Sequence, residues 1–408
     1  MIRNDRESAA AVLKRARESE AEMTAFLRDM IALPSESGSE GPVVERIRQE
    51  MQRVGFDEVV VDGMGNILGR IGSGPRVIAM DAHIDTVGVG DPAAWSHDPF
   101  QGKLEDGVLY GRGASDQEGG MASMVYAGRI VRELGLAKGC TLWVVGSVQE
   151  EDCDGLCWQY ILREGVLRPE VVVLTEPTNL GVYRGHRGRM EIGVTVRGRS
   201  CHGSAPERGI NAVYRMARVI GEIEKLNERL ATDPFLGKGT VTVSHIESNS
   251  PSLCAVPDRA YIHLDRRLTV GETEETAVAE VRDVLERAGV EGDVEVLTYA
   301  VPSYTGLSYP TRKYYPTWVL PENHAACRSA VEAYQSLFDQ APRVDKWTFS
   351  TNGVATMGMF GIPTVGFGPA NEIHAHAVTD QVPVEHLVKA AAFYALFPSM
   401  YCSLAEEG

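Results

Sequence analysis

The chain has 408 residues, more than one hydrophobic core usually holds, so its length predicts two domains. Hydrophobic residues make up 44% and charged residues 24%, which is ordinary globular composition and excludes a disordered chain. The net charge of −16, without any Lys/Arg-rich run, argues against nucleic acids and anionic membranes as partners.

The N-terminal segment and the cysteines indicate where the protein resides. Charges recur throughout the first residues, so they lack the apolar core of a signal peptide, and their helical spacing predicts a helix ending near Pro34. No uncharged apolar run reaches the roughly 18 residues of a membrane span. The seven scattered cysteines are typical of reduced thiols, and Cys153 and Cys157 have no second pair with which to bind zinc. We therefore expect a soluble, cytoplasmic protein.

Predicted strands and helices alternate along most of the chain. The strands are nearly continuous apolar runs at residues 58–62, 76–83, 141–148, 171–176 and 363–368. Helical periodicity marks residues 117–136, 155–164, 323–338 and 384–398. This alternation is typical of an α/β domain whose mostly parallel sheet is covered by helices.

The middle of the chain has a different order of elements. Its predicted order is strand 189–198, helix 209–231, strands 240–247 and 257–268, helix 274–289 and strand 293–300. A β-α-β-β-α-β order predicts a ferredoxin-like α+β domain inserted into the larger one. We therefore divide the chain into a larger domain at residues 1–186, an inserted domain at 187–302 and the remainder of the larger domain at 303–408.

Side chains that can bind metals follow the ends of the apolar strands. They are His83, Asp85, Asp116, Glu150, Glu151 and Glu176. In open α/β sheets, sites form beyond the carboxyl ends of the strands. So many carboxylates in one place repel each other unless cations neutralise them. An isolated His-x-Asp pair is more often a cap and a core histidine, but four successive strand ends or loops indicate a metal site.

One further ligand is expected near the C-terminus. The segment GPANEIHAHAVTD places His374 and His376 in a loop just after the predicted strand 363–368. Histidine is a common metal ligand, but surface loops often contain histidines. The residues alone leave open which of the two completes the site.

These motifs resemble the signature of the zinc aminoacylase and exopeptidase family. Its members include acetylornithine deacetylase, succinyl-diaminopimelate desuccinylase and glutamate carboxypeptidase. The matching segments follow the family's order and are HID, GRGASDQEGG, QEED, TEPT and AHAVTD. In detail, the chain also resembles a hydrolase branch of the family linked to selenium and purine catabolism.

The resemblance implies two divalent metal ions. Zn²⁺ is the preferred ion, and Co²⁺ or Mn²⁺ are the alternatives. It assigns His83 and Glu176 to one metal, Glu151 and His376 to the other, and Asp116 to both. It also makes Glu150 the general base, and it places the Asp85 carboxylate behind His83, where it fixes the imidazole tautomer.

The resemblance also reaches the inserted domain. The segment CHGSAPERGINA implies a homodimer in which His202 enters the partner's site to polarise the scissile carbonyl, and it makes Asn211 a substrate contact. Arg267 in LDRR would bind a substrate carboxylate, unless it merely pairs with Asp265 on its own strand. Asn352 stands where the family often has an acid, so the far end of the substrate need not be cationic.

The sequence thus predicts a two-metal hydrolase that cleaves the amide bond of a small carboxylate-bearing substrate. We favour an N-acyl or N-carbamoyl amino acid, or a dipeptide, over acetylornithine or succinyl-diaminopimelate. An inactive, metal-holding binding protein is the non-enzymatic alternative, and the intact Glu150 argues against it. A nicotinamide dehydrogenase is disfavoured because Asp116 stands where the third glycine would be. A serine hydrolase is disfavoured because no Gly-x-Ser-x-Gly segment occurs.

Overall fold

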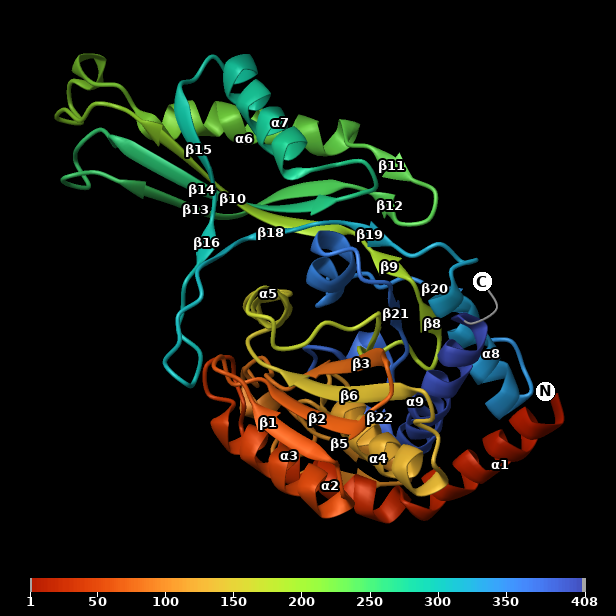
Figure 1. Ribbon diagram of the computed structural model, residues 1–408. Helices are drawn as coiled ribbons and strands as arrows, with labels where there is room; N and C mark the ends of the chain where they lie inside the picture. The colour runs from red at the N-terminus through yellow and green to blue at the C-terminus, as the bar shows by residue number, and fades with distance from the viewer. Residues whose placement is uncertain (1, 406–408) are drawn as a thin grey trace.

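The structure, a computed structural model, describes residues 2–405. Two main sheets, each with its own hydrophobic core, form the body of the molecule. Figure 1 shows the smaller sheet with its two helices lying above the larger sheet and its helices. The chain passes between them at the start of β10 (Gly188–Arg197) and again through the segment after β15 (Gly292–Val296).

The N-terminal part forms three helices, α1 (Ile2–Glu18), α2 (Glu20–Ile31) and α3 (Gly41–Val54). The predicted helical end near Pro34 is confirmed, because α2 ends at Ile31, but the helix is not single, because the chain breaks at Ser19. The buried Ser19 hydroxyl donates to the carbonyl of Arg15 at 3.0 Å, a local bond of the kind that bends helices.

The larger sheet has eight strands, and its four central ones run parallel. The strands at one edge pair antiparallel, as does the pair β21–β8 near the other, so the α/β class is confirmed but the sheet is mixed. In spatial order they are β1 (Glu58–Val61), β2 (Ile67–Gly72), β6 (Cys140–Ser147), β3 (Arg76–His83), β7 (Val171–Leu174), β21 (Thr364–Gly366), β8 (Val182–Tyr183) and β20 (Val344–Asp345).

Helices cover both faces of this sheet. Figure 1 shows α4 (Glu118–Leu134) and α9 (Val384–Ala405) below it, α5 (Leu156–Arg163) above it, and α8 (Ala325–Phe338) beside α9. Within residues 2–405, α9 is the one helix long and apolar enough to cross a membrane. However, 72% of its apolar window is buried inside the protein.

The smaller sheet confirms the predicted ferredoxin-like order. Its strands β13 (Thr240–Asn249), β14 (Arg259–Leu268), β10 and β15 lie side by side and antiparallel. Figure 1 shows α6 (Ala212–Arg229) and α7 (Glu274–Ala288) on one of its faces. A strand from the following connector, β18 (Tyr314–Tyr315), also pairs with β10. The domain boundaries at 187 and 302 therefore stay a prediction.

Short elements complete the fold. A three-stranded sheet joins β4 (Lys103–Glu105), β5 (Val108–Tyr110) and β22 (Gln381–Pro383). Two-stranded pairs join β9 (Gly185–His186) to β19 (Trp318–Val319), β11 (Thr232–Asp233) to β12 (Gly237–Lys238), and β16 (Thr298–Tyr299) to β17 (Thr311–Arg312). Helical turns cover Pro92–Ala94, Pro206–Arg208, Val354–Met359 and Glu372–His374.

Strand β14 places a fully buried arginine and a half-buried arginine on opposite faces of the small sheet. Arg266 is fully buried, and its guanidinium lies 2.6 Å from Glu272 and 3.0 Å from Glu280. Its neighbour Arg267 points to the opposite face, as the alternation of side chains along a strand requires.

We expect Arg266→Ala to lower the free energy of unfolding by about 3–5 kcal/mol, because the Glu272 side chain, only 9% exposed, would lose its counter-charge. Urea denaturation followed by circular dichroism measures the change. Arg259→Ala, at the exposed start of the same strand, is the matched control and should shift stability by less than about 0.5 kcal/mol. Equal effects of the two variants would contradict this account of β14.

Candidate metal centre

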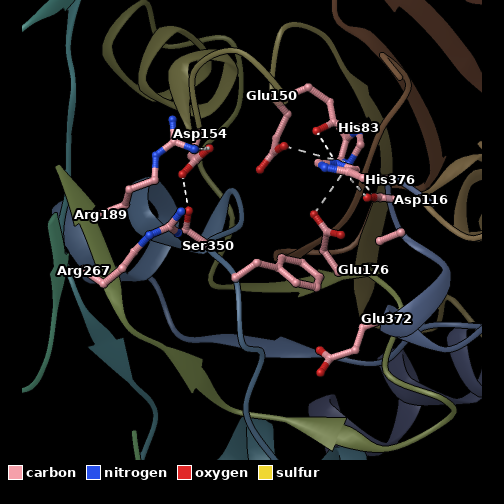
Figure 2. Close-up of a pocket in the computed structure, with 13 residues that line it drawn as sticks. His83, Asp116, Glu150, Asp154, Glu176, Arg189, Arg267, Ser350, Glu372 and His376 are labelled. Carbon is pink, nitrogen blue, oxygen red and sulfur yellow. Dashed lines mark hydrogen bonds and ion pairs between the residues drawn. The ribbon is translucent and has the colours of Figure 1, made fainter. Parts of the chain in front are cut away.

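Six of the predicted side chains meet beyond the carboxyl ends of the parallel strands. They line one cavity of about 270 Å³, and they are His83, Asp116, Glu150, Glu151, Glu176 and His376. Strands β3, β6 and β7 end at or just before four of them, and loops supply Asp116 and His376. Figure 2 shows the labelled members of this set gathered on one side of the cavity.

Asp116 lies between the two histidines. One of its carboxylate oxygens is 3.0 Å from His83 Nε2, and the other is 3.4 Å from His376 Nε2. His376 Nε2 also lies 2.8 Å from Glu151, and His83 Nε2 lies 3.7 Å from Glu176. His374, the alternative ligand, contacts Thr379 and Gln381 instead. The geometry therefore favours His376 over His374, and it gives Asp116 the position that a bridging ligand needs.

The donor atoms of this cluster fit metal ions. The oxygens Glu150 Oε1, Glu151 Oε1 and Glu176 Oε2 are buried and accept no hydrogen bond. Donor atoms of His83, Glu150 and Glu176 lie within 4.8 Å of one another, and so do those of His83, Asp116 and Glu151. A buried carboxylate oxygen without a partner is costly, and cations would satisfy these oxygens. The residues present thus suit two divalent ions.

Burial and hydrogen bonds also determine which groups of the cluster hold protons. Burial raises the pKa of Glu150 and of Glu176 well above the usual range. Burial acts against the ionised form of Asp116 too, but hydrogen bonds with His376 and His83 bring its pKa below its usual value. Hydrogen bonds with Asp116 and Glu151 raise the pKa of His376 to about 10. Without cations the cluster therefore retains protons, which metal binding would release.

Asp85 holds the loop that carries Glu150 and Glu151. Its buried carboxylate accepts the backbone N–H groups of these two residues at 3.1 and 3.0 Å, and the Ser37 hydroxyl at 2.6 Å. The predicted contact of this carboxylate with the His83 imidazole is longer, at 3.6 Å. The backbone carbonyl of Asp85 lies 2.8 Å from His83 Nδ1 instead. The carbonyl, and not the carboxylate, therefore orients the ring.

Asp380 was missed at the sequence level, although it ends the quoted segment AHAVTD. Its buried carboxylate accepts the N–H groups of Gly113 and Ser115, both at 2.8 Å, and it pairs with Arg112 at 3.1 Å. Strand β22, which follows Asp380, pairs with β5, which precedes the same glycine-rich turn. Asp380 therefore fixes the turn that presents Asp116 against the loop that presents His376.

Two predicted substrate contacts have structural roles in this chain. The buried Asn352 amide donates to Asp81 at 2.8 Å and to Ser147 at 3.0 Å, and its oxygen accepts from Gly155 and Cys157. Asn211 caps helix α6, where its oxygen accepts backbone N–H groups of the first turn. Neither side chain lies in the wall of the cavity.

His202 lies far from the cluster of its own chain. It is exposed in the loop beyond the distal end of β10, and its Nδ1 lies 2.7 Å from the Ser204 hydroxyl. Strand β10 has ten residues, so it places that loop about 30 Å from the cavity wall at Arg189.

The remaining wall of the cavity contains residues that the motifs did not indicate, apart from Arg267. They are Asp154, Arg189, Arg267, Phe349, Ser350, Glu372 and Ala375. Arg189 and Arg267 are opposite one another on β10 and β14, and Figure 2 shows both across the cavity from the histidines. Arg267 also forms two hydrogen bonds with Asp265, at 2.8 and 2.9 Å, which is the pairing considered as the alternative.

Comparison with known proteins agrees with this site. A protein of Escherichia coli strain K12 named uncharacterized protein YgeY is 56% identical over 95% of this chain and 96% of its own. The succinyl-diaminopimelate desuccinylase of Rhodospirillum centenum is 28% identical, covering 91% of this chain and 95% of its own. The Bacillus subtilis YXEP protein, described as a dinuclear metal-binding peptidase, has a similar fold. The two structures superpose with a TM-score of 0.70 at 15% sequence identity, and the match covers 95% of this chain and 99% of the YXEP chain.

The model of peptidase family M20/M25/M40 matches residues 79–399, which span the whole metal cluster and the inserted domain. The chain therefore belongs to peptidase family M20/M25/M40 and is a metal-dependent hydrolase that acts on amide bonds.

Proposed function

We propose that the protein hydrolyses the amide bond of a small carboxylate-bearing substrate, using two divalent cations. The observation that carries this proposal is the cluster, buried except for His376, in which Asp116 lies between His83 and His376 while neighbouring carboxylate oxygens have no partner. The cavity of about 270 Å³ is close to the lower limit for pockets that hold small ligands. A small molecule, and not a folded polypeptide, is the expected substrate.

In this proposal His83 and Glu176 would hold one cation, Glu151 and His376 would hold the other, and Asp116 would be shared by both. When bound, such cations polarise a substrate carbonyl and lower the pKa of a water molecule towards neutrality. The mixture of imidazole and carboxylate ligands favours Zn²⁺, with Co²⁺ or Mn²⁺ as alternatives.

Glu150 is the proposed general base. Its buried carboxylate lines the cavity with one oxygen unpartnered, so it can accept a proton from the attacking water and return it to the leaving amine. The competing assignment makes Glu150 a metal ligand, because its carboxylate lies within 4.8 Å of the donor atoms of His83 and Glu176.

Arg267 is the proposed contact for the substrate carboxylate. Asp265 engages its Nε and Nη2, which fixes the guanidinium plane at the cavity wall and leaves Nη1 for a ligand. N-acyl amino acids, N-carbamoyl amino acids and dipeptides all carry a free carboxylate that Arg267 could bind. Succinyl-diaminopimelate and acetylornithine are the alternatives, the first supported by the name of one relative.

We further propose a homodimer in the cytoplasm. Strand β13 is an edge of the small sheet and is mostly exposed, and Ile246 on it and Leu253 just beyond it expose apolar side chains. An unpaired edge of this kind favours pairing with a second copy. A dimer is the arrangement in which His202 could act at a metal centre, because it lies far from the centre of its own chain. The cysteines of the described residues form no disulfide bond with one another, which supports a reducing compartment.

The purified protein should carry about two divalent ions per chain. Chelation should abolish amide hydrolysis and lower the melting temperature, because the ions bind only the folded state. Elemental analysis and differential scanning fluorimetry measure these effects. A protein grown with zinc that contains no metal and is indifferent to chelator would refute the metal centre.

Substitutions of the adjacent glutamates separate the two assignments of Glu150. Glu150→Gln removes the base but keeps its shape, so kcat should fall roughly 10²–10⁴-fold with metal content unchanged. Glu151→Gln should lose metal. Elemental analysis beside steady-state kinetics distinguishes the variants, and metal loss in Glu150→Gln alone would make Glu150 the ligand.

Mixed dimers test the role of His202. Chains carrying His202→Ala and chains carrying Glu150→Gln should each be inactive, and together they should regain part of the activity through dimers with one intact site. Subunit exchange is verified with affinity tags. Exchange without recovered activity would show that His202 does not act across the dimer.

A further inference from the structure

Gln149 stands directly before Glu150 and Glu151, and the proposed mechanism does not use it. Its side chain is fully buried, and its backbone has a φ of +57°, in the left-handed region that residues other than glycine rarely adopt. Such a conformation persists only where the surroundings hold the residue in place. The contacts of Gln149 therefore bear on the position of the two glutamates that follow it.

The connector of residues 297–313 runs from β15 to β18 and links the small domain to the larger one. Figure 1 shows it descending from β15 through β16 toward the larger sheet. Both of its ends are fastened to one residue of β10. Leu297 N–H donates to the Glu191 carbonyl at 3.0 Å, and Glu191 N–H donates to the Lys313 carbonyl at 3.1 Å. The Glu191 carboxylate pairs with Lys313 and with Arg189 of the cavity wall, both at 2.9 Å, so the connector follows the small sheet.

The middle of the connector is bound to the loop that carries the glutamates. The amide nitrogen of Gln149 donates to the Tyr299 hydroxyl at 3.0 Å. It also donates, in two longer bonds, to the carbonyls of Pro302 and Val301 at 3.3 and 3.4 Å. The Tyr299 hydroxyl donates in turn to the Asp152 carboxylate at 3.1 Å. One amide and one hydroxyl thus tie the connector to the residues on both sides of the two glutamates.

The loop is therefore held from two directions. Asp85 accepts the backbone N–H of Glu150 at 3.1 Å from the side of the larger domain, whereas Gln149 and Tyr299 hold the loop from the side of the connector. A general base works only within hydrogen-bond reach of the water whose proton it accepts, and a displacement of about 1 Å can cost about 100-fold in rate. The connector is thus placed to set the reach of Glu150.

We propose that Gln149 is a positioning residue that, together with Tyr299, makes the working position of Glu150 depend on the connector and hence on the small domain. This inference rests on the proposed role of Glu150 in amide hydrolysis and adds a requirement to it. The base is in place only when the domain that carries Arg189 and Arg267 is in place. The link thereby couples the position of the base to the wall opposite the metal cluster.

Hydrogen exchange measured by mass spectrometry tests the link without any substrate. Gln149→Met removes the amide donor at nearly constant side-chain length, and Tyr299→Phe removes the hydroxyl. We expect each to speed the exchange of backbone amides in residues 149–153 about 3- to 10-fold, the effect of one lost hydrogen bond. Tyr309→Phe is the matched control, because this tyrosine of the same connector donates to Glu164 instead, and it should leave the exchange unchanged.

Steady-state kinetics tests whether the link positions the base. The substrate is whichever of a panel of N-acetyl amino acids, N-carbamoyl amino acids and dipeptides the metal-loaded, unmodified chain cleaves fastest. We expect Gln149→Met to lower kcat about 10- to 100-fold with KM and metal content nearly unchanged, because it displaces the base and not the ions. Tyr299→Phe should lower kcat in the same direction, and Tyr309→Phe should not change it.

A double variant separates positioning from general damage to the loop. A chain that already carries Glu150→Gln has no base left to place. Adding Gln149→Met to it should therefore lower kcat by no more than about 2-fold further. A further loss as large as that in the unmodified chain would show that Gln149 acts on something other than Glu150, and it would overturn the proposal.

The outcomes keep this inference apart from the proposed function. Unchanged hydrogen exchange, unchanged kcat or loss of metal in Gln149→Met overturns the positioning role and leaves amide hydrolysis intact. Absence of cleavage by the unmodified, metal-loaded chain contradicts the proposed function itself, and hydrogen exchange then decides alone whether the link exists. Faster exchange, together with a loss of kcat that disappears in the Glu150→Gln background, confirms the positioning role of Gln149.

Discussion

The electrostatic repulsion among buried carboxylates at one end of the larger sheet is the constraint on which the rest of the structure depends. Glu150, Glu151 and Glu176 each keep a buried oxygen without a hydrogen bond. A folded chain tolerates such a group only if cations or protons neutralise it. Parallel strands bring these side chains together because their carboxyl ends all lie at the same edge of the sheet.

Two further carboxylates keep this cluster in place without belonging to it. Asp85 binds the backbone of the loop with Glu150 and Glu151, and Asp380 binds the backbone of the turn with Asp116. Both act through backbone N–H groups, which fix the course of the chain whatever the neighbouring side chains are. The small sheet then contributes the opposite wall through Arg189 and Arg267. The cavity thus combines a metal-binding wall, a cationic wall and the separate carboxylate of Glu372.

The fold and the cluster could be predicted largely from sequence because both depend on local patterns. Apolar strands ending in His83, Glu150 or Glu176 carry their own signal, and so does the β-α-β-β-α-β order. The break at Ser19 and the antiparallel edges of the sheet depend on tertiary contacts instead. Asn352 was misinterpreted because an aligned position does not say which way a side chain points. Glu372 gave no signal at all, since only the folded loop shows that it lines the cavity.

Anomalous diffraction from crystals grown with zinc tests the central claim most directly, because it locates the ions independently of activity. The account predicts two peaks per chain, about 3.5–4 Å apart, with Asp116 between them and Glu150 outside both coordination spheres. His83 and Glu176 should contact one ion, and Glu151 and His376 the other. A single peak, or peaks elsewhere than in this cavity, would contradict the two-metal centre.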